Sequence, residues 1–372
     1  MNSSYSNSSY TLETICSLEK LKEFKGDYNA LWALSPNSSG FQHFDWIIAC
    51  VENLPAGKYE LFVQIVSMNN LPVLVLPHQK HGSHITWIGQ SVSNYCSPVY
   101  LCEHVQSSLN FWCDWILNQS TIKSVDWKNI HTENPFYHAA ISLSTLWGGF
   151  EDCATACCPV ICIKEDWETK LQTHSSKQRS NWRRKWRRLS DLGDVRFREV
   201  TKFVDIEPLI PQMYQLFEMR WTDRKTSEGF SPALQQFHTA AIKTDAVRVS
   251  LIEINSNVVA FSYGIRSNEG TISYVLGHDV NYDKYSPGLL LLLKLLEAAW
   301  QRGDLFYDFS LGDMPYKDAW ADEQYFVHRL IWGRGRRVRA FTQRVWTMMR
   351  EVPLFKAVKQ RSYIVNKLVK RQ

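Results

Sequence analysis

The sequence has no long hydrophobic run of the kind that crosses a membrane. A membrane-spanning helix needs about 20 consecutive apolar residues, and the run that comes closest, the leucines from 289 onward, is interrupted by Lys294 and Glu297. The first residues, MNSSYSNSSYTLE, lack the basic start and the apolar core of a signal peptide. We therefore expect a cytoplasmic protein in which residues 1–19 form a short disordered lead.

An excess of proline and glycine is also absent. Hydrophobic residues make up 45% and charged residues 21% of the 372-residue chain. Such a composition is typical of a folded globular protein and argues against a disordered one. A chain of this length has room for a large core, and it favours two domains over one.

The cysteines lack a recognisable metal-binding spacing. Their number is nine, which is odd, and reduced thiols are the simplest interpretation for a chain without a signal peptide. The tightest group is Cys153, Cys157, Cys158 and Cys162, and its C-x3-C-C-x3-C spacing differs from the C-x2-C pairs of zinc sites. We expect buried thiols there and no metal site.

Acidic residues are scarce in two stretches of the chain. Residues 177–188, KQRSNWRRKWRR, carry seven positive charges and no acid, and residues 334–372 carry 12 Lys and Arg against the single Glu351. Both stretches are candidate anion-facing surfaces. Because apolar residues alternate with the cations near the end, residues 341–372 are predicted to form a basic amphipathic tail that binds an anionic membrane surface from the cytoplasmic side.

One order of elements occurs twice. In residues 246–311, three strand-like stretches precede a helix that starts near Ser286 and a further strand, and residues 59–127 show the same order. The residues before the helix also repeat, as NYCSPVYLCE and DKYSPGLLLL. This pattern predicts an α/β (α+β) fold with two tandem copies of one domain, at 20–160 and 161–340.

The second of these helices begins with Ser286, Pro287 and Gly288. Serine is a good N-cap and proline fits a first turn, but glycine there costs about 1 kcal/mol relative to alanine. A bound phosphate would explain the glycine, because helix N-termini bind anions and a Cβ would keep a pyrophosphate away. The first copy has Val99 at this place, which predicts no phosphate site. The alternative is that Ser-Pro-Gly only ends one element and starts the next.

Several stretches resemble a known family. Three strands, a helix with an anion-binding N-terminus and a further strand resemble the acetyl-CoA-binding core of the GNAT acyltransferases. Individual stretches of the sequence resemble more specifically the CelD/BcsL-type acetyltransferases, which are associated with cellulose biosynthesis. These proteins are relatives of the FemAB peptidyltransferases and have two GNAT-like domains in tandem. The matching stretches are FQHFDWI (41–47), KQRSNWRRKWRRLSDLGDVRF (177–197), FEMRWTDRK (217–225), GHDVNYDKYSPGLLLL (277–292) and YDFSLGDMPYKDAWA (307–321).

The resemblance implies a metal-free acyltransferase that takes acetyl-CoA or another acyl-CoA as co-substrate. The acceptor would be an amine or hydroxyl, such as that of a sugar or polysaccharide precursor. The usual GNAT phosphate loop, Q/R-x-x-G-x-G/A, keeps one glycine here, and the residues expected to bind the donor are Lys284, Tyr285, Ser286, Gly288 and Leu289. Two alternatives stay open: an aminoacyl-tRNA-dependent transferase of FemAB type, whose basic stretches would bind RNA phosphates, and a non-catalytic scaffold on a membrane or a synthase complex.

Acyl transfer needs a proton acceptor and a group that acts on the leaving thiolate. Asp308 stands in an otherwise apolar strand, so it is either structurally hydrogen-bonded or a base held at a cleft; the resemblance favours the cleft. Tyr316 could protonate the thiolate and Lys317 could hold an anionic group, unless both lie in a solvated loop. His278 is the alternative base, although a lone histidine at a strand end is more often structural.

The residues expected at the acceptor come from three segments. By resemblance, Arg220 and Trp221 line the acceptor side, and Asp279 follows His278. Arg179 lies on a cationic face of the helix predicted at 177–189, and the resemblance implies that the cations of this helix could meet an anionic acceptor or the CoA phosphates. The alternative is that the tryptophans pack in a core and the cations are solvated.

Overall fold

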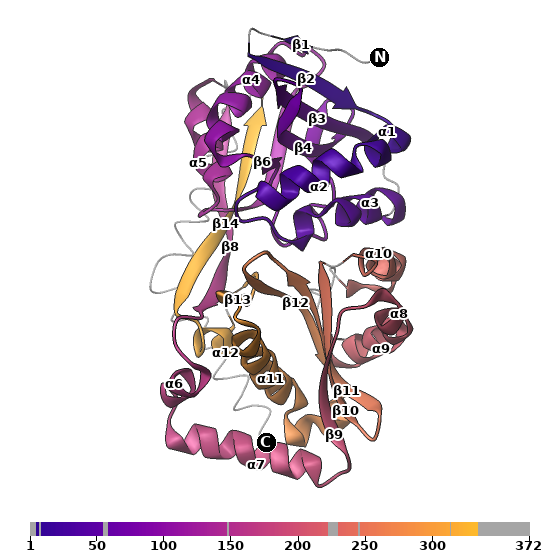
Figure 1. Ribbon diagram of the computed structural model, residues 1–372, viewed down its shortest axis with the longest axis vertical. Helices are drawn as coiled ribbons and strands as arrows, with labels where there is room; N and C mark the ends of the chain where they lie inside the picture. Colours follow the sequence, from indigo (N-terminus) through magenta and orange to yellow (C-terminus); the bar gives the residue numbers. More distant parts are fainter. Residues whose placement is uncertain are drawn as a thin grey trace.

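The computed structural model describes residues 5–6, 9–54, 59–146, 149–221, 230–244, 246–312 and 314–333. These residues form two lobes stacked along the long axis of the molecule, and one mixed sheet of 14 strands runs through both (Figure 1). The predicted α/β architecture is confirmed.

The upper lobe in Figure 1 is built mainly from the first half of the chain. Asn69 and Asn70 join its two longest early strands, and both have the positive φ, 52° and 64°, that a tight hairpin turn requires. Its strands are β1 (Tyr5–Ser6), β2 (Tyr10–Ile15), β3 (Glu60–Met68), β4 (Leu71–His81), β5 (His84–Trp87), β6 (Val99–Tyr100) and β7 (Ser124–His131). Its helices are α1 (Leu18–Glu23), α2 (Lys25–Leu34), α3 (Phe44–Asn53), α4 (Val105–Leu117) and α5 (Pro135–Ser142).

The lower lobe follows the predicted order of three strands, a helix and a strand. Asn255 and Ser256, again with positive φ, form the turn of its first hairpin. Its strands are β9 (Val195–Val200), β10 (Val247–Ile254), β11 (Asn257–Arg266), β12 (Gly270–His278) and β13 (Phe306–Asp308). Its helices are α6 (Trp167–Gln172), α7 (Ser176–Ser190), α8 (Phe203–Ile206), α9 (Ile210–Trp221), α10 (Gln235–Ala241), α11 (Pro287–Arg302) and α12 (Pro315–Asp318).

Two long strands connect the lobes: β8 (Phe150–Cys162) and β14 (Glu323–Gly333). In the sheet, β14 lies between β7 and β8, antiparallel to both, and the last residues of β8 pair with β13 of the lower lobe. The strand nearest the C-terminal end of the described chain therefore completes the sheet of the upper lobe. The boundary expected at residues 160 and 161 falls inside β8.

The buried side chains show the same coupling between lobes. One cluster fills the upper lobe around Trp87, Trp112 and Trp127 and includes Trp332 of β14. Another packs α11 on the sheet of the lower lobe. A third crosses the junction, where Trp46 of α3 and Phe237 of α10 lie with ring centroids 5.0 Å apart. The two lobes thus pack through a shared apolar core.

The N-terminal residues differ from the expected disordered lead. Residues 10–15 form β2, which pairs antiparallel with β3 over its full length. Leu12 and Ile15 are 1% and 3% exposed and belong to different core clusters, one on each face of the strand, while Thr11 and Glu13 are exposed. Pairing and burial together stabilise this segment against disorder.

The helix predicted in the first copy at about 102–118 is present, as a 3-10 turn (Cys102–His104) followed by α4, but the stretch before it differs from the prediction. Val99 lies in β6, which pairs with β4 and is fully buried, and α4 begins only at Val105. The likeness between NYCSPVYLCE and DKYSPGLLLL therefore does not extend to structure: the first stretch forms a strand where the second forms a helix N-terminus.

Candidate active site

The strands β12 and β13 lie side by side only over the first three residues of β12. Their parallel ladder ends with Ile272 opposite Asp308, whereas β12 continues to His278. The register of β12 against β11 shifts at Tyr274, and such a bulge bends a strand. Beyond Asp308 the chain follows β8 instead, since the amides of Phe309 and Gly312 donate to carbonyls of that strand. We call the point where the two strands part the β12–β13 fork.

The first turn of α11 lies beyond the open end of this fork. The helix begins at Pro287, as predicted, but Ser286 is in the left-handed region with φ 58° and its side chain does not cap the helix. The Ser286 hydroxyl instead contacts Nζ of Lys185 on α7. Pro287 has no amide hydrogen, and the Leu289 and Leu290 amides donate to the Ser286 carbonyl, at 3.1 and 3.2 Å. The turn thus offers few amides to an anion, and Lys185 adds positive charge beside it.

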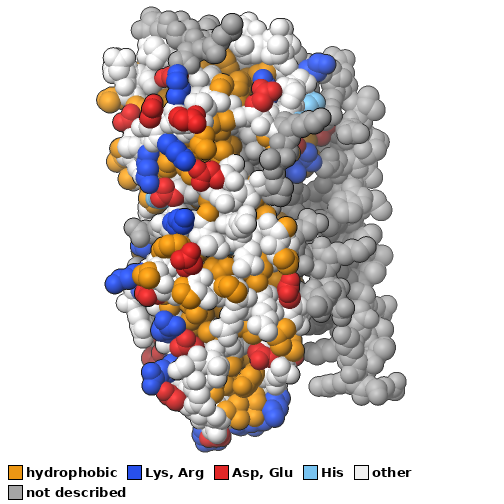
Figure 2. Space-filling view, turned by 90° about the vertical axis from the view of Figure 1, so that its right-hand side faces the viewer, with side chains coloured by type: hydrophobic (Ala, Val, Ile, Leu, Met, Phe, Trp, Pro, Cys, Tyr) orange, Lys and Arg blue, Asp and Glu red, His pale blue; other side chains and the backbone are white. Residues whose placement is uncertain are grey.

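More cations surround the residue before this turn. Two of them lie near the Tyr285 ring, with Lys284 Nζ at 5.0 Å and Arg188 Cζ at 5.6 Å from its centroid, both cation–π distances. The helix α7 runs across the lower end of the molecule (Figure 1), and basic side chains mark that end in Figure 2. Because a helix N-terminus also carries partial positive charge, this region favours a polyanion.

Arg220, His278 and Asp283 form a chain of hydrogen bonds next to α11. Arg220 Nη1 lies 2.9 Å from His278 Nδ1, and His278 Nε2 lies 2.7 Å from a carboxylate oxygen of Asp283. Since a guanidinium can only donate, Nδ1 accepts and the hydrogen of the neutral ring lies on Nε2. Burial lowers the pKa of His278, against the opposing effect of its hydrogen bond to Asp283. The ring is neutral, with both nitrogens engaged.

This chain explains Gly288 differently from the expected phosphate clearance. A Cβ on Gly288 would lie 3.0 Å from His278 Nδ1 and 3.4 Å from Arg220 Nη1. The glycine therefore leaves room for the histidine and arginine side chains, which accounts for it without a bound phosphate; the phosphate site expected here stays a prediction. The same glycine brings Arg220 against the first turn of α11.

Asp308 lies at the inner end of the fork and is 4% exposed. One carboxylate oxygen accepts a hydrogen bond of 2.7 Å from the hydroxyl of Tyr95 in the upper lobe, and the other accepts from the amide of Ser310. Burial raises the pKa of Asp308 to about 6, although both hydrogen bonds and the charge of Lys317 oppose the rise. The carboxylate fixes the lobe junction and the left-handed Ser310 (φ 59°).

Lys317 and Tyr316 are neighbours with different surroundings. Lys317 is 6% exposed, and its ammonium group donates to the carbonyls of Leu311, at 2.7 Å, and Ser310, at 3.3 Å. Tyr316 is 40% exposed. Partial burial raises the pKa of Tyr316, and the charge of nearby Arg220 lowers it in part. Lys317 thus shapes the segment after β13, while Tyr316 offers its hydroxyl beside Arg220.

The remaining predicted residues lie apart from this group or contribute locally. Arg179 donates to the carbonyl of His174 at 2.5 Å, near the start of α7 and away from Ser286. Asp279 caps the short helix that leads to α11, accepting from the amide of Asn281 at 2.9 Å. Trp221 is the last residue of α9, and its side chain lies outside the described part of the structure.

Three side chains at the site were missed by the sequence reasoning. Lys185 lies three residues after Trp182, next to the aromatic face of α7, and this position on the helix could have singled it out over Arg179. Asp283 lies five residues after His278, and in a turn this spacing does not predict that the two side chains meet. Tyr95 is 213 residues from Asp308 in the chain, and no local pattern indicates such a contact.

The structure also bears on metals and membranes. Among the described residues, no group of three or more His, Cys, Asp or Glu side chains is arranged to hold a metal ion. In the same part of the chain, no helix is both long enough and apolar enough to span a bilayer. The predicted basic tail, residues 341–372, lies outside the described residues.

Comparison with known proteins identifies the type of this domain. Residues 176–318 match the family described as acetyltransferase (GNAT) domain, and this range includes α7, the β12–β13 fork, α11 and Tyr316. No curated protein sequence matches the chain.

Solved structures share the fold over most of the chain. FemX superposes with a TM-score of 0.60 at 9% identity, covering 86% of this chain and 98% of FemX. L-PGS from Bacillus licheniformis superposes with a TM-score of 0.55 at 11% identity, covering 89% of this chain and 96% of that one. At such low identity these likenesses show a common two-lobed architecture.

Proposed function

Since residues 176–318 form an acetyltransferase domain of the GNAT family, we propose that this enzyme transfers an acetyl or longer acyl group from acyl-CoA to an amine or hydroxyl. The observation that carries this proposal is the positive charge at the first turn of α11. Lys185 contacts Ser286 there, and Arg220 lies beside Gly288. A diphosphate-bearing donor matches two cations from different helices at a helix N-terminus.

The basic surface around Tyr285 extends this binding region. Arg188 of α7 and Lys284, the residue before Tyr285, both lie within cation–π distance of the Tyr285 ring. A nucleotide donor carries further phosphate and an aromatic base, which cations and an aromatic side chain can bind. We therefore assign the phosphates to Lys185 and Arg220 and the nucleotide end to the surface of α7 and the turn before α11.

The chemistry is assigned to Tyr316, whose side chain is partly exposed and lies in the field of Arg220. The acceptor attacks the thioester carbonyl, the bond between carbon and sulfur breaks, and CoA leaves as a thiolate that takes a proton from the Tyr316 hydroxyl. The proton released by the acceptor restores the tyrosine through solvent. His278 cannot take the acceptor proton in this arrangement, because Arg220 and Asp283 engage both ring nitrogens. We assign it, with Asp308 and Lys317, to positioning.

The acceptor is the part of the proposal that rests on sequence resemblance. The CelD/BcsL-like stretches suggest an amine or hydroxyl of a sugar or polysaccharide precursor. The upper lobe reaches the fork, since the Tyr274 hydroxyl of β12 donates to the carbonyl of Val92 at 2.8 Å. Incubating cell extract with labelled acetyl-CoA and identifying the labelled product by mass spectrometry tests this assignment.

The donor is tested by calorimetric titration with acetyl-CoA. We expect Lys185→Gln to raise the Kd about tenfold, because it removes a charged phosphate contact. Arg196→Gln is the matched control, since Arg196 pairs with Asp194 on the exposed surface, where its side chain is 72% exposed. Wild-type protein that does not bind acetyl-CoA, or a Lys185→Gln variant that binds it unchanged, would contradict the proposal.

The basic face of α7 also favours a second candidate, an aminoacyl-tRNA-dependent transferase. Five of its seven cations are exposed: Lys177, Arg183, Arg184, Arg187 and Arg188. A row of exposed cations binds an RNA backbone with strong salt dependence. Supplying charged tRNA and acetyl-CoA in separate reactions decides between them: consumption of charged tRNA alone supports the second candidate.

A further inference from the structure

Helix α7, which carries Lys185, is joined by a stack of three rings to the segment that carries Tyr316. Trp320, two residues after the end of α12, is 4% exposed. Its ring centroid lies 5.3 Å from that of Trp182 on α7, with the ring planes 22° apart, and 4.1 Å from that of His174, in the turn between α6 and α7. The His174 and Trp182 rings lie 5.0 Å apart. We call these three side chains the tryptophan stack.

His174 serves this stack through its ring. It is 8% exposed, and its Nε2 atom is buried with no hydrogen-bond partner in the part of the chain that the structure describes. Burial lowers the pKa of His174, and the positive charges of Lys170 and Arg179 lower it further, so the ring is neutral at pH 7. Leaving a buried nitrogen unpaired is unfavourable, and packing against two indole rings offsets this cost. The position of His174 is therefore set by ring packing between α6, α7 and Trp320.

A buried ion pair joins the same two parts of the chain a second time. Lys170 of α6 is 5% exposed, and its Nζ lies 2.5 Å from one carboxylate oxygen of Asp322, two residues after Trp320. The other oxygen accepts from the Cys162 amide of β8 at 3.1 Å. The Trp320 amide in turn donates to the carbonyl of Lys317 in α12, at 3.0 Å. The segment from α12 to Asp322 is thus one unit, held by α6, α7 and β8.

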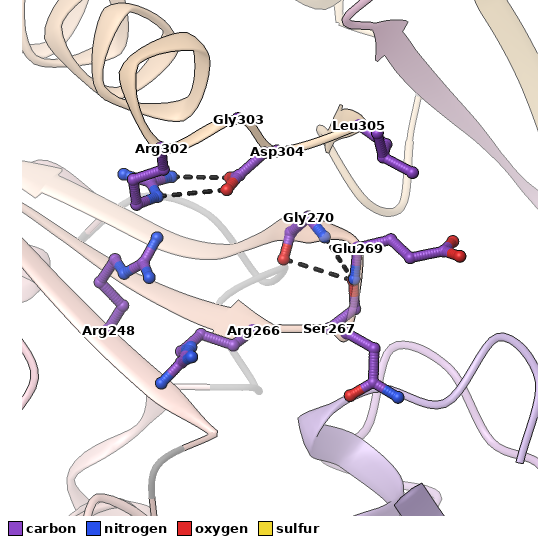
Figure 3. Close-up of a pocket in the computed structure, with 10 residues that line it drawn as sticks. Arg248, Arg266, Ser267, Glu269, Gly270, Arg302, Gly303, Asp304 and Leu305 are labelled. Carbon is purple, nitrogen blue, oxygen red and sulfur yellow. Dashed lines mark hydrogen bonds and ion pairs between the residues drawn. The ribbon is translucent and has the colours of Figure 1, made fainter. Parts of the chain in front are cut away.

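Helix α11 is fixed independently of this stack. At its far end Arg302 pairs with Asp304, as Figure 3 shows, and with Glu199 of β9, at 2.8 Å each. Along its length, Lys294 Nζ lies 5.0 Å from the centroid of the Trp186 ring of α7, a cation–π distance. Trp186 therefore joins α7 to α11, whereas the tryptophan stack, one turn earlier, joins α7 to α12.

We propose that Trp182 and Trp320 are positioning residues, which place Tyr316 relative to the helix that holds the donor. Lys185 lies three residues after Trp182, within one turn of α7, and Tyr316 lies four residues before Trp320. A donor phosphate that binds Lys185 fixes α7, and the stack passes this constraint to α12 and the Tyr316 hydroxyl. Since a misplaced catalytic group loses much of its effect, the stack makes proton transfer depend on a bound donor. This inference rests on the proposed function, because it needs Lys185 at the donor and Tyr316 as the acid.

Kinetics of Trp182→Leu test this connection, because the change is made on α7 and leaves α12 itself unaltered. We expect kcat for acetyl transfer to fall about tenfold with the donor Kd within a factor of about two, and Trp182→Phe, which keeps a ring, to recover most of kcat. In a Tyr316→Phe background, Trp182→Leu should lower kcat less than about twofold, since it acts through the missing hydroxyl. The matched control is Trp186→Leu, which faces α11, and its effect should be equal in both backgrounds.

The place of Tyr316 can also be measured without turnover, by fluorine NMR of protein that contains 3-fluorotyrosine. Tyr316→Phe identifies the signal. We expect Trp182→Leu and Trp320→Leu to shift or broaden it and Trp186→Leu to leave it in place; Trp182 is only half-buried, so its variant should stay folded, as thermal unfolding will show.

The two measurements separate this inference from the proposed function. An unmoved Tyr316 signal in folded Trp182→Leu, or equal losses of kcat with and without the Tyr316 hydroxyl, would overturn the inference. A protein that transfers no acetyl group, but whose Tyr316 signal moves in Trp182→Leu and not in Trp186→Leu, would contradict the proposed function and support the link between α7 and Tyr316.

Discussion

The two nitrogen atoms of His278 decide what this residue can do. Arg220 donates a hydrogen bond to one nitrogen, and the other nitrogen donates to Asp283. The ring is therefore held by the Asp283 carboxylate and in turn holds the Arg220 guanidinium in place. Tyr316, in contrast, has a partly exposed hydroxyl within the field of that guanidinium. At the scale of single residues, the histidine is a positioning residue and the tyrosine is the group available for proton transfer.

Replacing Tyr316 by phenylalanine tests this division of roles. General acid catalysis typically contributes a factor of about 100 or more, so we expect Tyr316→Phe to lower kcat about 100-fold and to leave the Kd for the donor within a factor of about two. Tyr10→Phe, which removes a hydroxyl bonded to Ser107 in the upper lobe, is the control. Unchanged kcat in Tyr316→Phe would exclude the tyrosine as the acid.

The buried carboxylate of Asp308 predicts a pH dependence of stability. Its folded pKa of about 6 lies above its ordinary value of 3.8, so the folded protein binds this proton more tightly than the unfolded chain does. The contribution to the free energy of unfolding is therefore fully present below pH 3.8 and is lost as the pH rises through 6. The loss amounts to about 3 kcal/mol at 1.36 kcal/mol per unit.

Asp308→Asn removes this titration. We expect the stability of the variant relative to the wild type to rise by about 2 kcal/mol between pH 4 and pH 7, as measured by urea unfolding. The amide can still accept from the Ser310 amide and donate to the Tyr95 oxygen, so the shape of the junction is kept. A difference that is equal at both pH values would show that Asp308 titrates as an exposed carboxylate does.

At the scale of elements, α11 has a glycine at each end, and the two glycines are needed for different reasons. Gly288 is followed by regular helix and faces His278 and Arg220 at close range, whereas Gly303 has φ 73° and no heavy atom within 4 Å of its missing Cβ. The first glycine is needed for space next to two functional side chains. The second is needed for its backbone conformation, which ends the helix.

Alanine at each end should separate these requirements. Gly303→Ala should lower the free energy of unfolding by about 1 kcal/mol, the cost of a left-handed alanine, with the donor Kd unchanged. Gly288→Ala gains about 1 kcal/mol of helix propensity but displaces Arg220, so we expect near-normal Tm and weaker donor binding. Calorimetric titration with the donor and thermal unfolding of both variants measure these effects. Equal changes in donor Kd and in stability in the two variants would contradict the prediction.

The elements of the lower lobe were predictable because their signals are local. The turn residues of the β10–β11 hairpin, the alternating apolar strands and the Pro287 and Gly303 ends of α11 all lie within a few residues of what they determine. Reasoning from the sequence selected Arg220 and Tyr316 as site residues but did not predict their contacts. Tyr95 meets Asp308 across the lobe junction, and such a contact depends on how two lobes pack, which no short stretch encodes.

The upper lobe also follows the predicted order, in β3, β4, β5, α4 and β7, but local likeness misled the prediction at two places. Val99 and Gly288 follow similar stretches, yet Val99 pairs with β4 as part of β6. Residues 10–15 read as a polar lead, but the edge of β3 gives them hydrogen-bond partners and a core to bury Leu12. Tertiary pairing overrides local composition at both places.

At the scale of the whole molecule, β14 holds the two lobes in one sheet. It pairs with β7 and with β8, and Leu330 and Trp332 are 0% and 1% exposed in the core of the upper lobe. Removing this strand would leave two open sheet edges and a cavity among the tryptophans. The stability of the first half of the chain therefore depends on residues near its other end.

Truncation measures this dependence. We expect a chain that ends after Asp322, before β14, to lose cooperative unfolding by circular dichroism and to aggregate, since open edges pair with other chains. A chain that ends after Gly333 is the control and should unfold like the full-length protein. Within the full chain, Leu330→Ala should cost about 2 to 5 kcal/mol. Cooperative unfolding of the shorter chain would show that the upper lobe is complete without β14.

The position of β14 in the sequence also determines when the upper lobe can fold during translation. The ribosome finishes β8 at Cys162 and adds about 170 more residues before β14 is complete at Gly333, which takes roughly 10 to 30 s at 5 to 20 residues per second. Throughout that interval β7 and β8 are in the nascent chain without the strand that belongs between them. The upper lobe is thus translated first but can close only after the lower lobe has been translated as well, and until then the edges of β7 and β8 that β14 will pair with stay open.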